Sequence, residues 1–426
     1  MTTGAAADET IGTARQSPSR GARGALAYWT AQAVSQTGDE VYALAIPLIA
    51  YAIAGSASVM AALYAVSMLP HLVFGVAGGA WADRNGKKRM IVTLSLASAA
   101  VLGVLALAIS GRQQRLPLLF VGVFALSVLT SALLAAFDGA LNEVVRPERR
   151  IKVISSLEST RTLTVILGPI IAGLLVSVWR GSLPLLIDAL SFVLAAAIIS
   201  TVRFAGVPGR GGDSAYRNLA DSIREGLVYL WRTARLRYGV MLSTLNNAAL
   251  GGFEVLVVYR LRQNLGVSSV VTGAVFASGG AAALLASLVV PRLAGRIGLL
   301  RGMCLGLLGL GAAGVLLGVA PDAWVVAVAQ ASFISSGLVF NVCWRTYRQN
   351  HCESTMISRV AGACRGIAYC GATFGSGLCA AMIALGVPVP VYLCAGGAMV
   401  FVLGVFSRHL LAARAEDGDG CTAGSP

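Results

Sequence analysis

Apolar runs of about 20 residues recur along almost the whole chain, and they constrain its fold more than any other feature. Each run is long enough to cross a hydrocarbon layer of about 30 Å as a helix. Lipid offers no hydrogen bonds to a bare backbone, so runs of this length must be helical. Only 12% of the residues are charged, whereas soluble domains carry roughly 25%. The sequence therefore predicts an all-α integral membrane protein.

The breaks between the apolar runs predict twelve transmembrane helices in two six-helix bundles, at 25–203 and 238–411. The expected spans are 25–53, 58–82, 90–110, 116–140, 153–178, 183–203, 238–259, 268–290, 302–320, 323–344, 360–386 and 389–411. Repeated halves of this kind are a recurrent design in secondary transporters.

The longest connection, at 204–237, separates the two predicted bundles. Its Leu219, Ile223 and Leu227 recur at helical spacing, which is typical of an amphipathic helix on a membrane surface. The flanking segments 1–24 and 412–426 are expected to be disordered and cytoplasmic.

Lysine and arginine are distributed unevenly between the predicted loops. With both termini on one side, all three lysines and most arginines of the loops fall on that same side. Short loops rich in these residues stay cytoplasmic. We therefore expect a multi-pass protein of the cell inner (cytoplasmic) membrane with both termini cytoplasmic.

The composition also argues against several other functions. The net charge of +14 is spread between apolar runs, without a basic domain, so no nucleic acid partner is expected. The cysteines and the three histidines lack metal-ligand spacing, and no P-loop, HExxH or GxSxG motif occurs. We predict no enzyme activity, no cofactor and no bound metal.

The stretch "GGAWADRNGKKR" at 78–89 collects one acid and four cations between two apolar runs. Its pattern GxxxDRxGKK resembles the signature loop of the major facilitator superfamily. The matching residues are Gly79, Asp83, Arg84, Gly86, Lys87 and Lys88. The resemblance implies a latch that stabilises the outward-facing arrangement and breaks when the halves rock. The alternative is a cluster of charges that sets topology around a tight turn.

Two charged residues at predicted span ends are candidate partners of this loop. Asp138 ends the fourth span on the same side, so we expect it to accept a cation from the loop. Arg359 enters the eleventh span, where it would meet Asp83.

Three further stretches resemble the drug-efflux branch of this superfamily that includes macrolide-efflux and enterobactin-exporter proteins. They are "SQTGDEVYALAIPLIAYAIAGSA" (35–57), "IDALSFVLAAAI" (187–198) and "REGLVYLWR" (224–232). The similarity extends over roughly 25–410. It implies a membrane transporter that exports small molecules.

"TVILGPIIAGLL" at 164–175 resembles the GxxxGPxxGG signature of exporters through Gly168, Pro169 and Gly173. The proline removes a backbone donor and kinks the helix, and the glycines permit close packing. Thr164 and Ala172 replace two glycines of the pattern. Small residues and prolines are also common in membrane helices generally, which is the alternative explanation.

Ionisable groups within membrane spans are costly, so they are candidate functional residues. Asp39 and Glu40 lie together in the first span, about 100° apart around a helix, so both cannot face one cavity squarely. Asp39 matches the pattern of the efflux branch and is our first candidate for a proton or cation site. A structural hydrogen-bonding role is the alternative.

Other polar groups in the spans are candidates for the central cavity or for proton transfer. Glu254, Asn246 and Asn341 come from the second bundle and are expected to line the cavity. His71 titrates in a range that suits a proton relay, although a lone membrane histidine is more often a hydrogen-bonded packing residue.

Glu158 and Arg161 lie three residues apart in the fifth span and can pair on one helix face. We predict a structural ion pair, with gating or substrate contact as the alternative.

These features predict a secondary active transporter that exports small amphipathic molecules, such as a drug, an antibiotic or a siderophore-like compound. It would work by alternating access and proton antiport as a monomer in the lipid bilayer, with a small-molecule substrate and the proton as its partners. The alternatives are an importer or a lipid transporter of the same fold, or a membrane sensor that does not transport.

Overall fold

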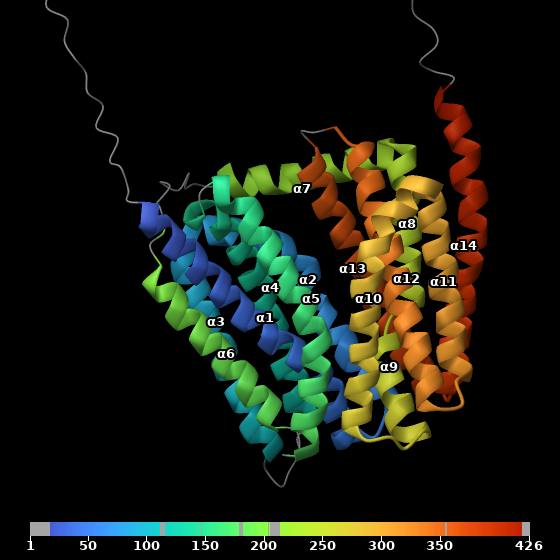
Figure 1. Ribbon diagram of the computed structural model, residues 1–426, viewed down its shortest axis with the longest axis horizontal. Helices are drawn as coiled ribbons and strands as arrows, with labels where there is room; N and C mark the ends of the chain where they lie inside the picture. The colour runs from blue at the N-terminus through green and yellow to red at the C-terminus, as the bar shows by residue number, and fades with distance from the viewer. Residues whose placement is uncertain are drawn as a thin grey trace, which may run out of the picture.

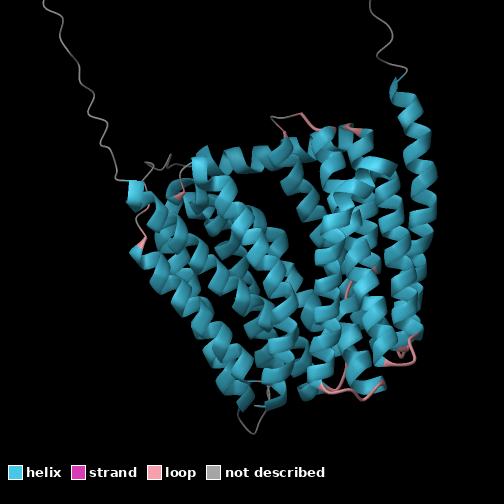
Figure 2. Ribbon diagram, in the orientation of Figure 1, coloured by secondary structure: helices cyan, strands magenta, loops and turns pink. Residues whose placement is uncertain are grey.

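The computed structural model describes residues 18–110, 116–145, 147–178, 182–202, 204, 214–353 and 356–419. For some helical segments, chiefly residues 18–22, 72–85, 214–220 and 408–419, it describes the backbone alone. Every regular element in these ranges is a helix (Figure 2). The predicted all-α class is confirmed.

Six long helices form the N-terminal half. They are α1 (Pro18–Ala54), α2 (Ala57–Asn85), α3 (Lys87–Ser110), α4 (Leu116–Val144), α5 (Pro147–Val178) and α6 (Ser182–Thr201). Within this half α1 packs on α5 and α6, α2 packs on α4, and α3 packs on α4 and α6.

The C-terminal half begins with an interrupted helix. Its elements are α8 (Ala234–Ala249), α9 (Phe253–Tyr259), the π-helix η1 (Arg260–Asn264), α10 (Ser269–Ile297), α11 (Leu299–Val319), α12 (Ala323–Asn350), α13 (Ile357–Ala384) and α14 (Val389–Asp419). Here α11 packs on α12 and α14, α10 packs on α12, and α13 packs on α8.

Eleven helices among the described residues are long and apolar enough to cross a membrane. One of them, Ala234–Asn264, combines α8, α9 and η1 into the seventh predicted span. The remaining predicted span is α2, a helix of 29 residues whose apolar part is described over Ala57–His71. The arrangement agrees with twelve spans in two bundles.

The helices continue beyond the apolar spans at both ends of the chain. α1 begins at Pro18 and α14 extends to Asp419, so helix occupies parts of both tails that the sequence analysis expected to be disordered. Alanine and arginine, which are good helix formers, are frequent in these flanks and extend the helices past the membrane.

The connecting helix α7 (Ser214–Arg232) lies across one end of the molecule, near the first residues of α1 and the last residues of α14 (Figure 1). We call this end the α7 face. The helix packs on α13, where the absent side chain of Gly226 allows contact with the backbone of Arg359. Its Leu230 is buried while Arg224 is exposed, as expected of an amphipathic helix.

Two helix pairs make the most extensive described contacts between the halves, α2 with α13 and α5 with α10. At the second pair, which we call the α5–α10 seam, the backbones touch. A Cβ atom at Gly173 would lie 2.5 Å from the carbonyl oxygen of Ser269, and one at Gly273 would overlap the carbonyl oxygen of Pro169. Only glycine fits at these two positions. The exporter-like segment therefore packs directly against the other half.

Candidate functional site

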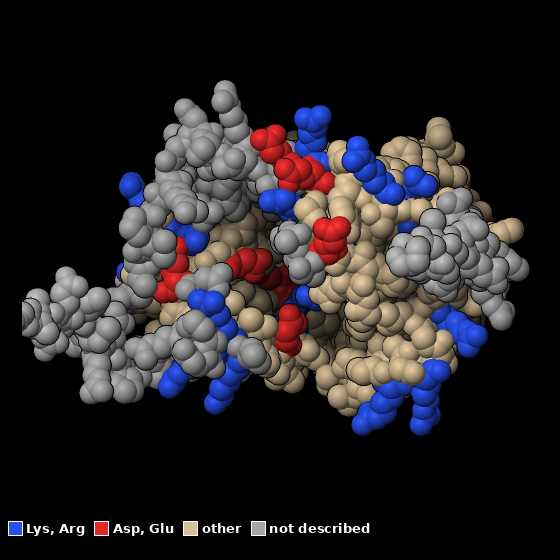
Figure 3. Space-filling view, turned by 90° about the horizontal axis from the view of Figure 1, so that it is seen from above, with Lys and Arg blue, Asp and Glu red and all other residues tan. Residues whose placement is uncertain are grey.

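A cavity of about 830 Å³ lies between the two halves. Its walls come from α2 and α5 on one side and from α8 to α12 on the other. Viewed from the α7 face, the molecule is hollowed between the halves, with acidic and basic side chains around the hollow (Figure 3). A volume of this size is within the usual range for sites that take drug-sized ligands.

Polar side chains line the cavity from both halves. Glu158 and Arg161 come from α5, and Asn246, Asn341 and Arg345 come from the C-terminal half. Asn246 is 7% exposed, and its side-chain oxygen has no hydrogen-bond partner among the described residues. Such an oxygen is available to accept a hydrogen bond from a bound molecule.

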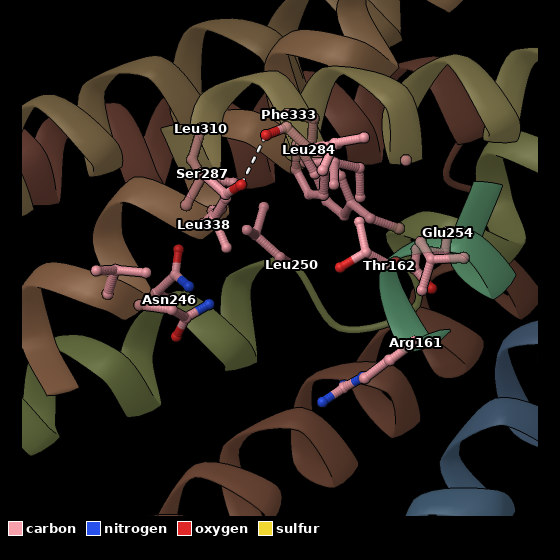
Figure 4. Close-up of a pocket in the computed structure, with 18 of the residues that line it drawn as sticks. Arg161, Thr162, Asn246, Leu250, Glu254, Leu284, Ser287, Leu310, Phe333 and Leu338 are labelled. Carbon is pink, nitrogen blue, oxygen red and sulfur yellow. Dashed lines mark hydrogen bonds between the residues drawn. The ribbon is translucent and has the colours of Figure 1, made fainter. Parts of the chain in front are cut away.

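Apolar side chains form another part of the wall. The ring of Phe253 stacks on Phe333 with centroids 5.8 Å apart, and Leu250, Leu310 and Leu338 lie nearby (Figure 4). A wall that combines apolar surface with polar groups suits amphipathic small molecules.

Glu254 lines both this cavity and a smaller one of about 130 Å³, where Glu40 of α1 and the buried Gln330 of α12 are also found. In Figure 4 it lies with Thr162 at one end of the cavity, away from Asn246. The two carboxyl groups therefore come from opposite halves. Glu40 and Glu254 lie within electrostatic range and repel each other, while Arg161 attracts Glu40.

Local backbone features place both carboxyl groups. The seventh span breaks at Gly251 and Gly252, where Gly252 has a φ of 80°, and Glu254 begins the next helix. A Cβ atom at Gly168 would lie 2.7 Å from the Cβ atom of Glu40, so this glycine allows α1 to approach α5.

The structure places Asp39 and His71 outside both cavities. Asp39 is exposed and lies near Asp188 of α6, while its neighbour Glu40 faces the smaller cavity. A nitrogen of His71 lies 3.2 Å from the carbonyl oxygen of Ser67, and its ring packs against Tyr369 of α13, with centroids 5.3 Å apart.

Among the described side chains, Glu158 and Arg161 make no ion pair with each other. Both are exposed and line the cavity instead. This arrangement favours the alternative of substrate contact, because side chains that face an open cavity are accessible to a bound molecule. A structural ion pair would instead be packed among other side chains.

The loop that resembles the superfamily signature is described in part. Gly86 takes a positive φ of 79° between α2 and α3, which explains the glycine. Lys87 pairs with Glu143 of α4 at 2.8 Å, and Lys88 donates to the carbonyl oxygens of Ser200 and Val202 at the end of α6. Positions 79, 83 and 84 lie where only the backbone is described.

The described partners of the loop and of the eleventh span differ from those we expected. The carboxylate that accepts Lys87 is Glu143, one turn beyond Asp138, because Lys87 extends past Gly139. Asp138 instead lies within electrostatic range of Arg365 on α13. Arg359 pairs with Glu225 of α7, and the side chain of Asp83 lies outside the described side chains.

At the face opposite α7, aromatic and polar side chains join the halves. The hydroxyl of Tyr51 donates to Gln263 over 2.8 Å, and its ring meets Tyr259 edge to face at 6.0 Å. The guanidinium of Arg262 lies 5.6 Å from the centre of the Tyr51 ring. We call this set the Tyr51 contact. It closes the end of the molecule that lies away from the hollow.

Several of these residues escaped the sequence analysis. Gln330 is a polar residue in the middle of an apolar run, and that position alone was a usable signal. Glu143 and Gln263 gave no such signal, because each lies among other polar residues at a span end, and Glu225 lies among the charged residues of the connecting helix α7.

Comparison with known proteins gives the family context. The sequence profile of the Major Facilitator Superfamily matches residues 28–376. Macrolide efflux protein A of Streptococcus pyogenes is 27% identical over 217 residues, which cover 51% of this chain and 53% of that protein. The uncharacterized MFS-type transporter YfiS of Bacillus subtilis (strain 168) is 26% identical over 276 residues, covering 64% of this chain and 65% of that one. In the macrolide efflux relatives, the match spans little more than half of the relative's length.

Solved structures share the fold at low sequence identity. A bacterial homologue of the iron transporter ferroportin, in an inward-facing state, aligns with a TM-score of 0.71 at 17% identity, over 92% of this chain and 99% of the other. The nucleoside transporter NupG (D323A mutant) aligns with a TM-score of 0.71 at 12% identity and the same coverage.

Proposed function

This chain belongs to the Major Facilitator Superfamily of membrane transporters, and from that premise we propose that it exports small amphipathic molecules in exchange for protons. The observation that carries the proposal is the cavity between the halves, whose wall combines apolar and polar side chains and includes Glu254, which also lines the smaller cavity with Glu40. A bound amphiphile would place its apolar part against Phe253 and Phe333 and its cationic group near the carboxylates.

The direction of transport is supported by the relatives and by the distribution of charge. Lysine and arginine gather at the α7 face, so we place that face in the cytoplasm, with the protein in the cytoplasmic membrane. The cavity is then open to the cytoplasm, where an exporter takes up its substrate. The similarity to macrolide efflux protein A supports a drug or antibiotic as the substrate.

Transport would proceed by alternating access. The Tyr51 contact breaks while the halves close at the α7 face, and the α5–α10 seam adjusts as they rock. A ligand shifts such an equilibrium only by its different affinity for the two states. Proton binding at carboxyl groups and substrate binding in the cavity would favour opposite states, which is antiport.

Flux in reconstituted vesicles tests this proposal. The protein is placed in liposomes with an imposed proton gradient, and the movement of a radiolabelled macrolide and of tetraphenylphosphonium is followed. We expect uphill movement of at least one compound against the proton flow, lost when the gradient is dissipated. Movement in the same direction as the protons would favour an importer. Binding without any movement would favour a sensor.

A further inference from the structure

Asp188 of α6 is completely buried in the interior of the N-terminal half, at 0% exposure. The hydroxyl of Ser191 donates to one of its carboxyl oxygens over 3.2 Å, and the other oxygen has no hydrogen-bond partner among the described residues. An ionised carboxylate in such a place is strongly disfavoured unless a positive charge or hydrogen-bond donors compensate it.

The carboxyl group of Asp188 lies directly against α1. A Cβ atom at Gly38 would overlap both this carboxyl group and the hydroxyl of Ser191, so the glycine makes room for them. The next residue, Asp39, lies within electrostatic range of Asp188. One turn further along, the hydroxyl of Tyr42 is buried, has no hydrogen-bond partner in the described part of the chain, and lies within electrostatic range of both acids.

No described cation compensates these two acids. Among the hydrogen bonds and ion pairs of the described residues, none brings a lysine or arginine to Asp188. Helix α3 also packs on α6, but its charged residues lie in the first turn of α3. There Lys88 donates to the backbone at the end of α6. The charged residues of α5 within the membrane, Glu158 and Arg161, line the cavity, and the remaining acid of this part of α1 is Glu40.

We propose that Asp188 and Asp39 form a proton site within the N-terminal half, separate from the cavity in which the substrate binds. The inference rests on the proposed proton antiport and identifies where the transported proton is held. One proton adds to a carboxylate to give a carboxylic acid, and no other bond forms or breaks. Two carboxyl groups within electrostatic range of each other favour holding at least one proton, since ionising both would place like charges near each other.

The two acids have different exposures, and this suits a site that loads and unloads. Asp39 keeps some accessible surface, so in this proposal the proton exchanges there, whereas Asp188 is sealed by α1 and holds it. The hydroxyl of Tyr42 can donate to whichever carboxyl oxygen is charged.

Helix α1 connects the proton site to the substrate cavity. Asp39 belongs to the proton site, and the next residue, Glu40, packs on Gly168 of α5 and lines the smaller cavity. Loss of the proton adds a negative charge beside Glu40 and changes the environment that a bound cation meets. Proton and substrate therefore influence each other through adjacent residues of one helix without competing for one carboxylate.

Infrared difference spectroscopy of the reconstituted protein, recorded against pH without substrate, tests the site. We expect the wild type to show the signal of a protonated carboxyl group that Asp188→Asn lacks. The matched control is Asp221→Asn, which changes an exposed acid of α7 and should keep the signal. An unchanged signal in Asp188→Asn would overturn the proposal.

A second variant addresses the case in which Asp188→Asn does not fold. Ser191→Ala removes the donor to the ionised form, so the midpoint of the signal should move to higher pH. An unchanged midpoint contradicts the assignment. Replacing choline chloride by sodium chloride at fixed pH should leave the signal intact, and its loss in sodium would identify a metal cation site instead.

Substrate binding separates this inference from the proposed function. Tetraphenylphosphonium should bind Asp188→Asn within about twofold of the wild type, because Asp188 is not part of the cavity wall. Strong loss of binding would place Asp188 in the substrate site and contradict the proposal that the proton site is separate from the substrate cavity. If the wild type transports nothing while the infrared result holds, the proposed export fails and the proton site stands.

Discussion

The hydroxyl of Tyr51 on α1 donates a hydrogen bond to Gln263 in η1 over 2.8 Å, and this bond links the two halves at the face opposite α7. The contact is polar and lies at a helix end, so water can replace it when the halves separate. It is therefore suited to a contact that must break in each transport cycle.

Tyr51→Phe should shift the equilibrium towards the state open at this face by about fivefold, because a hydrogen bond of this kind contributes about 1 kcal/mol. The ring contact with Tyr259 is kept. Distances between spin labels at Ala52→Cys and Val270→Cys, in a background without the native cysteines, report the change. Gln263→Leu should have the same effect, and the double variant should add nothing further. Additive effects would show that the bond is not what links the halves.

Glu254→Gln should weaken the binding of tetraphenylphosphonium about tenfold, equivalent to about 1.4 kcal/mol, because the carboxylate attracts the cation inside the cavity. Titration calorimetry measures the affinity, and an uncharged amphiphile should bind both forms alike. Glu353→Gln, which changes an exposed acid outside the cavity, is the control. Equal affinities of wild type and Glu254→Gln would exclude Glu254 from the cation site.

Gly273→Ala should destabilise the protein by about 1–3 kcal/mol and slow transport, because the added methyl group meets the carbonyl oxygen of Pro169 in the α5–α10 seam. Thermal unfolding in detergent and vesicle flux measure the two effects. Gly103→Ala is the matched control, since a Cβ atom there meets nothing within 4 Å. A Gly273→Ala protein as stable as this control would mean that the helices at the seam are not in contact.

Removing Glu143 should lower the thermal stability more than removing Glu225. The Lys87–Glu143 side chains are 15% and 16% exposed, whereas those of Arg359 and Glu225 are 41% and 54% exposed. Solvent screens the second pair, which should contribute only about 0–1 kcal/mol. Melting curves of Glu143→Gln and Glu225→Gln compare them directly. The opposite order would show that α7, not the loop at 83–89, stabilises this face.

The fold could be predicted from the sequence because each membrane span carries its own signal. The run at 302–320 is apolar enough to identify α11 without reference to any partner. The interruption of the seventh span was not predicted, because Gly251 and Gly252 also suit a continuous helix that packs closely. The positive φ of Gly252 follows from tertiary packing, which no local pattern reveals.

The site was harder to predict than the fold. The sequence identified Asp39 and Glu40 as a pair, but which of them faces the cavity depends on how α1 is rotated against α5. That rotation depends on close approaches at Gly38 and Gly168, two contacts with residues far away in the chain. Likewise, three positions on α5 separate Glu158 from Arg161, a spacing that allows an ion pair, yet both side chains are exposed and line the cavity.

The break at Gly251 and Gly252 divides the seventh span into α8, which packs on α13, and a short outer part made of α9 and η1. The apolar side chains of this outer part are buried, and its Arg260 donates to the carbonyl oxygens of Gly318 and Ala320. That outer part carries Glu254 at its beginning and continues without interruption through Tyr259 to Gln263. Any displacement that pulls Gln263 away from Tyr51 must then also move Glu254. A cation bound by this carboxylate would thus be coupled to the Tyr51 contact through one continuous stretch of helix. Occupancy of the cavity and opening at the far face would then depend on each other.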